Sequence, residues 1–371
     1  MNAAHATVAA VILAAVFGPG ATAQPPQPVV LKGHTKAVTA VAWAADGKSV
    51  ATAGDDRSIR VWNPVTGQQT TSLTAIAREG YGSPAVAFTA DLKLAAVNYW
   101  GEITVRAVAD GKVLTTIDPI LDRGQKSAFR PDVFALAFSP DGKRLASAGS
   151  VAAVGGAHGL PGGVVIVWDA ETGKIVHKSD KLSTAASSVT WTPDGKRVVA
   201  GTSGAGGELQ EAGQVWVWDA ETGKALHTFP VKPKTAYGEW ASAADVAVSP
   251  DGKRVAAPVT AGSRGAPAGI IIDDTGASVR VWDLGTGKDT QPVKGLKSSV
   301  GRLTFSPDGK LLATAGSDKV VRLWVADEGR ELAALPTADR VGAVAFSPDG
   351  KSLAAGSKDG SVRIWPVPAT K

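Results

Sequence analysis

The sequence of 371 residues predicts an all-β protein built from repeated copies of one four-stranded unit. Two recurring phrases carry this prediction. The first is a short alternating run of β-branched residues that ends in Trp and enters a turn with Gly, as in residues 164–174, 215–224 and 279–288. The second is an Asp-Gly-Lys turn, as in residues 46–48 and 141–143. The run is typical of a half-buried strand, and Asp-Gly favours the tight turn of a hairpin.

The turn phrase sets the number of units at seven and divides each unit into four strands. Its aspartates fall at 46, 91, 141, 194, 251, 308 and 349, and the copy at 91 is degenerate because Leu92 replaces Gly. In the first unit we expect strand a at Ala37–Trp43, strand b at Ser49–Ala53, strand c at Ser58–Trp62 and strand d at Gln69–Leu73.

The two ends of the repeat region complement each other. The seventh unit lacks a strand d, because the chain ends within six residues of Trp365. The segment Pro28–Leu31 precedes the first strand a and has no earlier partner. We therefore expect this N-terminal strand to join the last unit, which closes the array into a ring and removes an open sheet edge.

Units of this length, with Gly-His before strand a and Trp-Asp after strand c, resemble the WD40 repeat family over residues 29–366. The resemblance implies a seven-bladed β-propeller of four-stranded antiparallel blades around a central channel. It also implies a buried hydrogen-bonded set in each blade, and only the first blade has all four members, His34, Thr52, Asp56 and Trp62. We interpret His34 and Asp56 as part of this structural set rather than as a catalytic pair.

Residues 1–23 differ in composition from the rest. They hold no charged side chain, carry an apolar run from Val8 to Phe17 and end in a small-x-small pattern, as a secretory signal peptide does. The expected organisation is a signal peptide at 1–23, a Pro-rich lead-in at 24–28, the propeller at 29–366 and a short tail at 367–371. The protein is then an exported one of bacterial type, periplasmic or extracellular, without a membrane span after cleavage.

Composition argues against several kinds of chemistry. The chain has no cysteine, and its five histidines are scattered, so neither a metal site nor a cofactor is expected. The formal net charge of +5 comes from interspersed Lys, Arg, Asp and Glu, which argues against a nucleic-acid partner. Since no catalytic constellation is legible, we expect a non-enzymatic, monomeric ring.

The repeats are broken in a way that locates a functional surface. The interval from the residue four positions after the turn aspartate to the strand-c Trp position measures the length of each b–c hairpin. It is 12 residues in the first, second, sixth and seventh blades, and 23, 20 and 27 residues in the third, fourth and fifth. The added residues fall in b–c connections, and several d–a connections are also long. In an antiparallel meander the b–c and d–a connections lie at the same end of the blade, here named the decorated end. The a–b and c–d turns lie at the opposite end, here named the turn end.

Aromatic and basic residues in or beside the decorated-end connections are candidate partner contacts, because such residues dominate binding hot spots. An alternative is that the aromatic rings pack inside their own long loops. The candidates are Arg78, Tyr81, Tyr99, Trp100, Arg123, Lys126, Phe129, Arg130, Lys232, Lys234, Tyr237 and Trp240.

The function favoured by these observations is a protein-interaction scaffold that presents the b–c and d–a loops of blades two to five to a protein or peptide. One alternative is a small-ligand receptor or enzyme with a site at the channel mouth of the same face. A further alternative is binding to acidic cell-envelope polymers through the basic loops.

Overall fold

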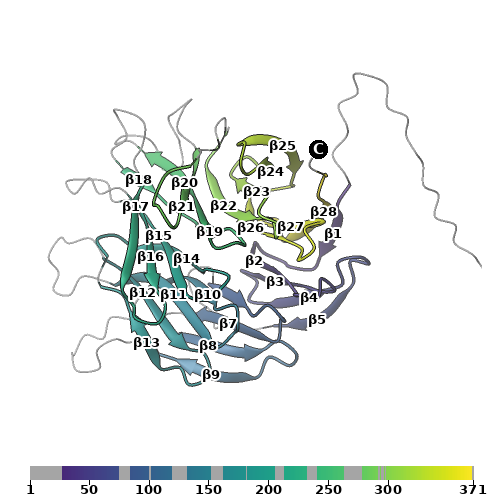
Figure 1. Ribbon diagram of the computed structural model, residues 1–371. Coiled ribbons are helices and arrows are strands. Elements are labelled where there is room, and N and C mark those ends of the chain that lie inside the picture. Colours follow the sequence, from purple (N-terminus) through teal and green to yellow (C-terminus); the bar gives the residue numbers. More distant parts are fainter. Residues whose placement is uncertain are drawn as a thin grey trace, which may run out of the picture.

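The computed structural model confirms an all-β propeller of seven antiparallel sheets arranged in a ring (Figure 1). Within the described residues the chain forms 28 strands and no helix. The structure describes residues 27–74, 84–99, 102–118, 132–151, 162–180, 182–204, 213–231, 240–262, 278–290, 293, 296 and 298–369.

The strands of blade one lie within one residue of the predicted bounds, and the next three blades have the same order of four strands. Blade one contains β2 (Val38–Trp43), β3 (Val50–Gly54), β4 (Ile59–Trp62) and β5 (Gln69–Leu73). Blade two contains β6 (Val86–Phe88), β7 (Leu94–Tyr99), β8 (Glu102–Ala107) and β9 (Val113–Ile117). Blade three contains β10 (Asp132–Phe138), β11 (Arg144–Val151), β12 (Gly162–Asp169) and β13 (Ile175–Lys178). Blade four contains β14 (Ala186–Trp191), β15 (Arg197–Thr202), β16 (Gln214–Asp219) and β17 (Ala225–Pro230).

The remaining blades include the irregular fifth and the composite seventh. Blade five contains β18 (Trp240–Ser242), β19 (Ala247–Val248), β20 (Arg254–Gly262) and β21 (Ser278–Asp283). Blade six contains β22 (Val300–Phe305), β23 (Leu311–Gly316), β24 (Val320–Val325) and β25 (Arg330–Pro336). Blade seven contains β26 (Val341–Phe346), β27 (Ser352–Ser357), β28 (Ser361–Pro366) and, from the other end of the chain, β1 (Val29–Lys32).

The a–b turns owe their shape to a residue with positive φ after the turn aspartate. Gly142 has a φ of 71° and Gly195 one of 68°, values that glycine adopts without steric cost. In the degenerate second copy Leu92 adopts a φ of 55°, although it is not glycine. Its side chain is buried between blades one and two, and we infer that this packing offsets the backbone strain.

The hydrophobic core lies between blades rather than within them. Seven separate clusters of buried side chains each combine two neighbouring blades. The strand-c Trp contributes to six of them; Trp168, for example, packs in the cluster shared by blades two and three. The exception is the cluster of blades one and two, where the strand-c position is Ala107. A single blade therefore cannot bury its own apolar faces, and the Trp serves as the joint to the preceding blade.

The first strands of neighbouring blades contact each other all the way around the ring. β2 contacts both β6 of blade two and β26 of blade seven, so the series returns to its start. β1 pairs antiparallel with β28, and its Leu31 lies opposite Val362. Leu31 is only 1% exposed and belongs to the cluster that joins blades seven and one. The outer strand of the last blade is thus supplied by the N-terminal part of the chain.

Blade five departs from the regular four-strand pattern. Its strand a is split into β18 and β19, which both pair with β20, and within the described residues its strand d is represented by the bridges Val279–Val293 and Trp282–Asp289. Asp245 lies between β18 and β19, and its carboxylate accepts the backbone N–H of Leu303 in blade six.

Within the described residues, the protein has no helix with the length and apolar character needed to cross a membrane.

Leu31→Ala should lower the free energy of unfolding by about 2–5 kcal/mol, because it removes a buried side chain from the closing strand. Val30→Ala is the matched control on the same strand; Val30 is 39% exposed, and its loss should change stability by less than about 0.5 kcal/mol. Denaturant unfolding of both variants measures the difference. Equal effects at the two positions would mean that β1 does not close the ring through this cluster.

Candidate functional site

The decorated end receives the b–c hairpins, and the structure shows where these begin to exceed the regular blade. In blade three the hairpin is extended, with Ser150 opposite Gly163 and Val151 opposite Gly162. In blade five β20 continues to Gly262 and pairs there with Trp240 of β18. The added residues therefore begin by lengthening the paired strands of the blade at this end.

The candidate partner contacts lie almost entirely outside the described residues, so the contact surface formed by them stays a prediction. The backbones of Tyr99 and Trp240 are the exceptions. Tyr99 ends β7 and Trp240 begins β18, which places both backbones at the decorated end. The candidates outside the described residues are Arg78, Tyr81, Trp100, Arg123, Lys126, Phe129, Arg130, Lys232, Lys234 and Tyr237.

Phe134 is an exposed aromatic residue at this end that sequence reasoning missed. It belongs to β10, an innermost strand, yet 50% of its surface is exposed. A register shift between Val133 and Ala135 leaves it unpaired with β11. Four other innermost strands have the same shift, and the unpaired residue there is small: Thr39, Ser187, Gly301 and Gly342. Phe134 is therefore the one large side chain among these five matched positions.

Arg302 and Asp245 occupy matched positions in adjacent blades, Arg302 on β22 of blade six and Asp245 between β18 and β19 of blade five. Each stands six residues before its turn aspartate, where the described residues of the other blades are Ala or Ser. Arg302 is exposed, and its Nε donates to the carbonyl oxygen of Gly342 at 2.7 Å. Alignment of the seven strands on the turn aspartate was the signal that could have revealed this charged pair.

Asp245 is a half-buried carboxylate between blades five and six. Its Oδ2 accepts the backbone N–H of Leu303 at 3.0 Å, and its Oδ1 accepts that of Val246 at 3.0 Å. Burial raises the pKa of Asp245, and the nearby Arg302 guanidinium opposes that rise. The bond from Leu303 joins the break between β18 and β19 to β22 of blade six.

The four-residue set of blade one is fully connected by hydrogen bonds. Trp62 Nε1 donates to Thr52 Oγ1 at 2.8 Å, and Thr52 Oγ1 lies 2.7 Å from His34 Nε2. His34 Nδ1 lies 3.0 Å from both carboxylate oxygens of Asp56. Ser58, a fifth member, donates from its hydroxyl to Asp56 at 2.7 Å. One neutral tautomer of His34, protonated at Nδ1, satisfies the whole chain of bonds.

This arrangement has the electrostatics of a structural set. The side chain of His34 is fully buried, and desolvation lowers its pKa although Asp56 acts in the opposite direction. The bonds from Ser58, His34 and the Thr35 N–H together lower the pKa of Asp56 despite its partial burial. His34 follows β1 by two residues, so the set anchors the linker between the closing strand and blade one.

Other blades retain parts of the same set. Trp324 Nε1 donates to Thr314 Oγ1 at 2.8 Å in blade six, where Leu296 replaces the histidine and packs against the apolar cluster. Trp168 Nε1 donates to Ser147 Oγ at 2.9 Å in blade three. The Trp–hydroxyl bond is therefore shared more widely than the histidine.

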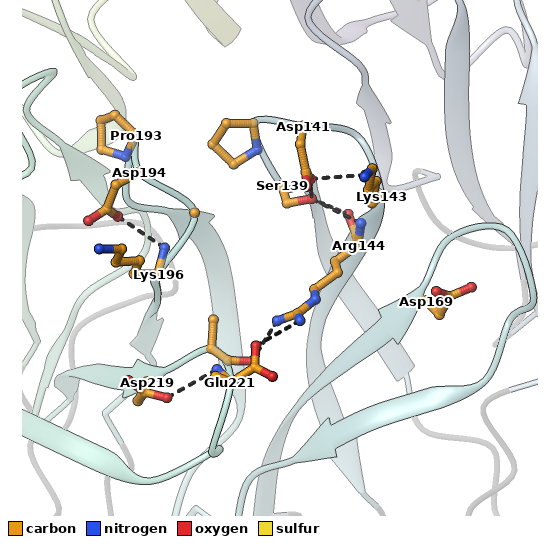
Figure 2. Close-up of a pocket in the computed structure, with 13 residues that line it drawn as sticks. Ser139, Asp141, Lys143, Arg144, Asp169, Pro193, Asp194, Lys196, Asp219 and Glu221 are labelled. Atoms are coloured by element: carbon orange, nitrogen blue, oxygen red, sulfur yellow. Dashed lines mark hydrogen bonds and ion pairs between the residues drawn. The ribbon is translucent and has the colours of Figure 1, made fainter.

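A cleft of about 970 Å³ lies at the turn end between blades three and four (Figure 2). Arg144 spans it, donating from Nη1 to the carbonyl oxygen of Ala220 at 3.0 Å and from Nη2 to Glu221 at 2.9 Å. Asp141 and Asp194 each accept a hydroxyl hydrogen bond and a backbone N–H within their own turn.

The cleft is lined mainly by charged and hydroxyl-bearing side chains from the turns of the two blades. The bonds from Ser139 and Thr192 lower the pKa values of Asp141 and Asp194, so these carboxylates stay ionised. No histidine is among the residues that line the cleft, and these residues therefore form no Ser-His-Asp arrangement. Elsewhere in the described parts of the chain, no group of three or more His, Asp or Glu side chains is placed to hold a metal ion.

Four segments of the chain match the family model "WD domain, G-beta repeat", at residues 26–63, 124–169, 288–325 and 329–366. Each segment contains strands a to c of one blade (blades one, three, six and seven), and the first and last also contain β1 and β25. The propeller therefore carries WD40 repeats. No curated protein sequence matches the chain.

The stability of the protein should fall as the pH drops below about 6.5, the ordinary pKa of histidine, because His34 is harder to protonate in the folded state than in the unfolded chain. His34→Gln should lower the free energy of unfolding at pH 8 by about 1–3 kcal/mol through lost buried hydrogen bonds. It should also flatten the pH dependence between pH 7 and pH 5. Thermal unfolding across this range tests both parts, with the partly exposed His177 of the outer strand β13 replaced by Gln as the control. A pH slope that survives in His34→Gln would contradict this account.

Proposed function

We propose that this seven-bladed WD40-repeat propeller is an interaction scaffold that holds a protein or peptide partner at its decorated end. WD40 propellers are generally protein-interaction scaffolds. The observation that carries the finer proposal is that three consecutive blades carry b–c connections 8 to 15 residues longer than the regular spacing, all at one end of the ring. The turn end keeps short turns throughout.

The physical advantage of such an end is preorganisation. Closure of the ring fixes the strand ends from which the b–c and d–a connections leave, and this reduces the ordering entropy that binding of a partner costs. Aromatic and Arg side chains supply the anchors of such surfaces, and the sequence concentrates Tyr81, Trp100, Arg123, Tyr237 and Trp240 in or beside these connections. The half-exposed ring of Phe134 adds an apolar anchor beside the axis of the ring.

The proposed setting is outside the cytoplasm. The apolar, uncharged segment at 1–23 supports export, and the absence of cysteine means that folding there needs no disulfide. N-terminal sequencing of the protein recovered from the exported fraction tests this part: cleavage before Gln24 is expected, and an intact Met1 would contradict it.

Simultaneous substitution of Arg123, Arg130, Tyr237 and Trp240 by Ala should reduce capture of the partner by about tenfold or more, because hot-spot anchors carry most of the binding energy. Cross-linking first identifies the partner, and quantitative pull-down then measures how much of it each variant captures. The matched control replaces three exposed apolar residues of the turn end, Val65, Leu114 and Ile175, by Ala and should leave capture unchanged. Loss of capture in the control alone would show that the partner binds the turn end and would contradict the proposal.

A further inference from the structure

We propose that Asp46–Gly47, in the turn between β2 and β3, is a site of spontaneous covalent modification at which the aspartate isomerises to isoaspartate. The inference is independent of the proposed function. It depends on a comparison among turns of the same chain: six of the seven turn aspartates are followed by glycine, and all six stand in the phrase Asp-Gly-Lys. The turn of blade one lacks three restraints that the other five share.

The chemistry of this modification needs only the protein and water. The backbone nitrogen of Gly47 attacks the side-chain carboxyl carbon of Asp46; the nitrogen loses its proton, and the protonated carboxyl group releases one oxygen as water. The product is a cyclic succinimide. Water then opens the ring at either carbonyl, which restores aspartate or gives isoaspartate, whose backbone passes through the former side chain. Glycine favours the attack because it has no side chain to obstruct its nitrogen.

The first restraint is a hydroxyl group two residues before the aspartate. Ser139 Oγ donates to the carboxylate of Asp141 at 2.6 Å, and Ser or Thr donates in the same way in the other four turns of the comparison. In blade one this residue is Ala44, and Asp46 Oδ1 accepts the backbone N–H of Lys48 at 2.9 Å. The carboxylate of Asp46 is thus held by one hydrogen bond fewer than that of Asp141.

The same hydroxyl bonds reduce the reactive form of the carboxyl group. They lower the pKa values of Asp141, Asp194 and Asp349, because they stabilise the ionised carboxylate. Succinimide formation proceeds from the protonated carboxyl group, so a lowered pKa slows the reaction at these three positions.

The second and third restraints limit the opening of the turn. The residue before the aspartate is proline in the five other turns, where its ring fixes φ, and it is Ala45 in blade one. The turn glycines of those five blades also lie against the preceding blade: a Cβ built on Gly195 would lie 3.6 Å from Pro140. A Cβ built on Gly47 would meet no atom of the described residues within 4 Å, and Gly47 lines a cleft of about 500 Å³ between blades seven and one.

These restraints distinguish Asp46 where exposure and local sequence do not. All six aspartates are exposed. In each of the six turns the glycine N–H donates to a backbone carbonyl oxygen, as Gly47 does to Ala44 at 2.8 Å, so the turn has to open before the nitrogen can attack. Opening costs least in blade one, because the hydroxyl, the proline and the contact with the preceding blade are all lacking there.

The modified turn would lie beside the contacts of blade one with both of its neighbours. Isoaspartate adds a carbon atom to the backbone path between residues 46 and 47. Ala45 N–H, one residue earlier, donates to the carbonyl oxygen of Ala90 in the turn of blade two at 2.7 Å. Trp43 Nε1 donates to the carbonyl oxygen of Ala345 in blade seven at 3.1 Å. Isomerisation at this turn therefore bears on the closure of the ring.

The test incubates the folded protein at pH 6 and 37 °C and follows isoaspartate by tryptic mapping. Trypsin releases each of the six turns in a separate peptide that ends at the turn lysine, such as 37–48 for blade one and 303–310 for blade six. Isoaspartate leaves the mass of a peptide unchanged but alters its chromatographic retention, and synthetic peptides serve as standards. Isoaspartate should accumulate in peptide 37–48 about fivefold faster or more than in any of the other five, as expected when a hydrogen bond that restrains opening is lost.

Two paired substitutions check that the restraints cause the difference. Ala44→Ser with Ala45→Pro installs the hydroxyl and the proline in blade one and should slow isomerisation there to the rate of the other turns. Ser347→Ala with Pro348→Ala removes both from blade seven and should raise the rate in that turn by about fivefold. Incubation in guanidinium chloride should bring all six turns within about threefold of one another, because the unfolded chain retains only the shared local sequence.

Equal rates at the six turns of the folded protein would overturn the proposal, and so would faster accumulation at any of the other five. Fast isomerisation that persists after Ala44→Ser with Ala45→Pro would show that these restraints do not set the rate, which also overturns it. Circular dichroism confirms that each variant is folded before incubation, and the comparison among the six wild-type turns does not depend on any variant.

Discussion

Burial of apolar faces between neighbouring blades is the constraint on which the rest of the structure depends. Each blade is a thin sheet whose apolar side chains are covered only when another blade stands beside it, and seven clusters, one for each pair of neighbours, supply this cover. A linear array of such blades leaves one apolar face open at each end. Closure of the ring removes both open faces, and the pairing of β1 with β28 achieves it through a strand of only four residues.

Two consequences for function follow from closure. The repeated elements, including the strand-c Trp and the turn aspartate, are occupied in holding the ring together, so they carry little information about a partner. The connections at the decorated end differ in length from blade to blade, whereas the turns at the opposite end stay short. The complete hydrogen-bonded set of blade one stands next to the closing strand, where it anchors the linker that joins the two ends of the ring.

Much of this architecture was predictable because it depends on local sequence chemistry. Asp-Gly turns and alternating strands identified the blades, and the bounds of strands such as β5 agree with the expected residues. Blade five was not predictable in the same way, since the break in its strand a falls at Asp245, whose carboxylate accepts a hydrogen bond from the backbone of blade six. Phe134 was missed because its exposure depends on a register shift within β10, which the residue itself does not signal.

The candidate site was likewise predictable only in part. Loop lengths could be counted from the sequence and pointed to one end of the ring. The cleft between blades three and four could not be found by counting, because Arg144 and Glu221 are 77 residues apart in the sequence and only the packing of the two blades brings them together.

Hydrogen–deuterium exchange of the protein with and without its captured partner tests the central claim most directly. Our account predicts protection at the decorated end, in segments such as 33–37, 132–135, 317–320 and 357–360, with exchange in the turn-end segments 139–144, 193–197 and 219–222 unchanged. Protection confined to those turn-end segments would place the partner in the cleft between blades three and four and would contradict the account.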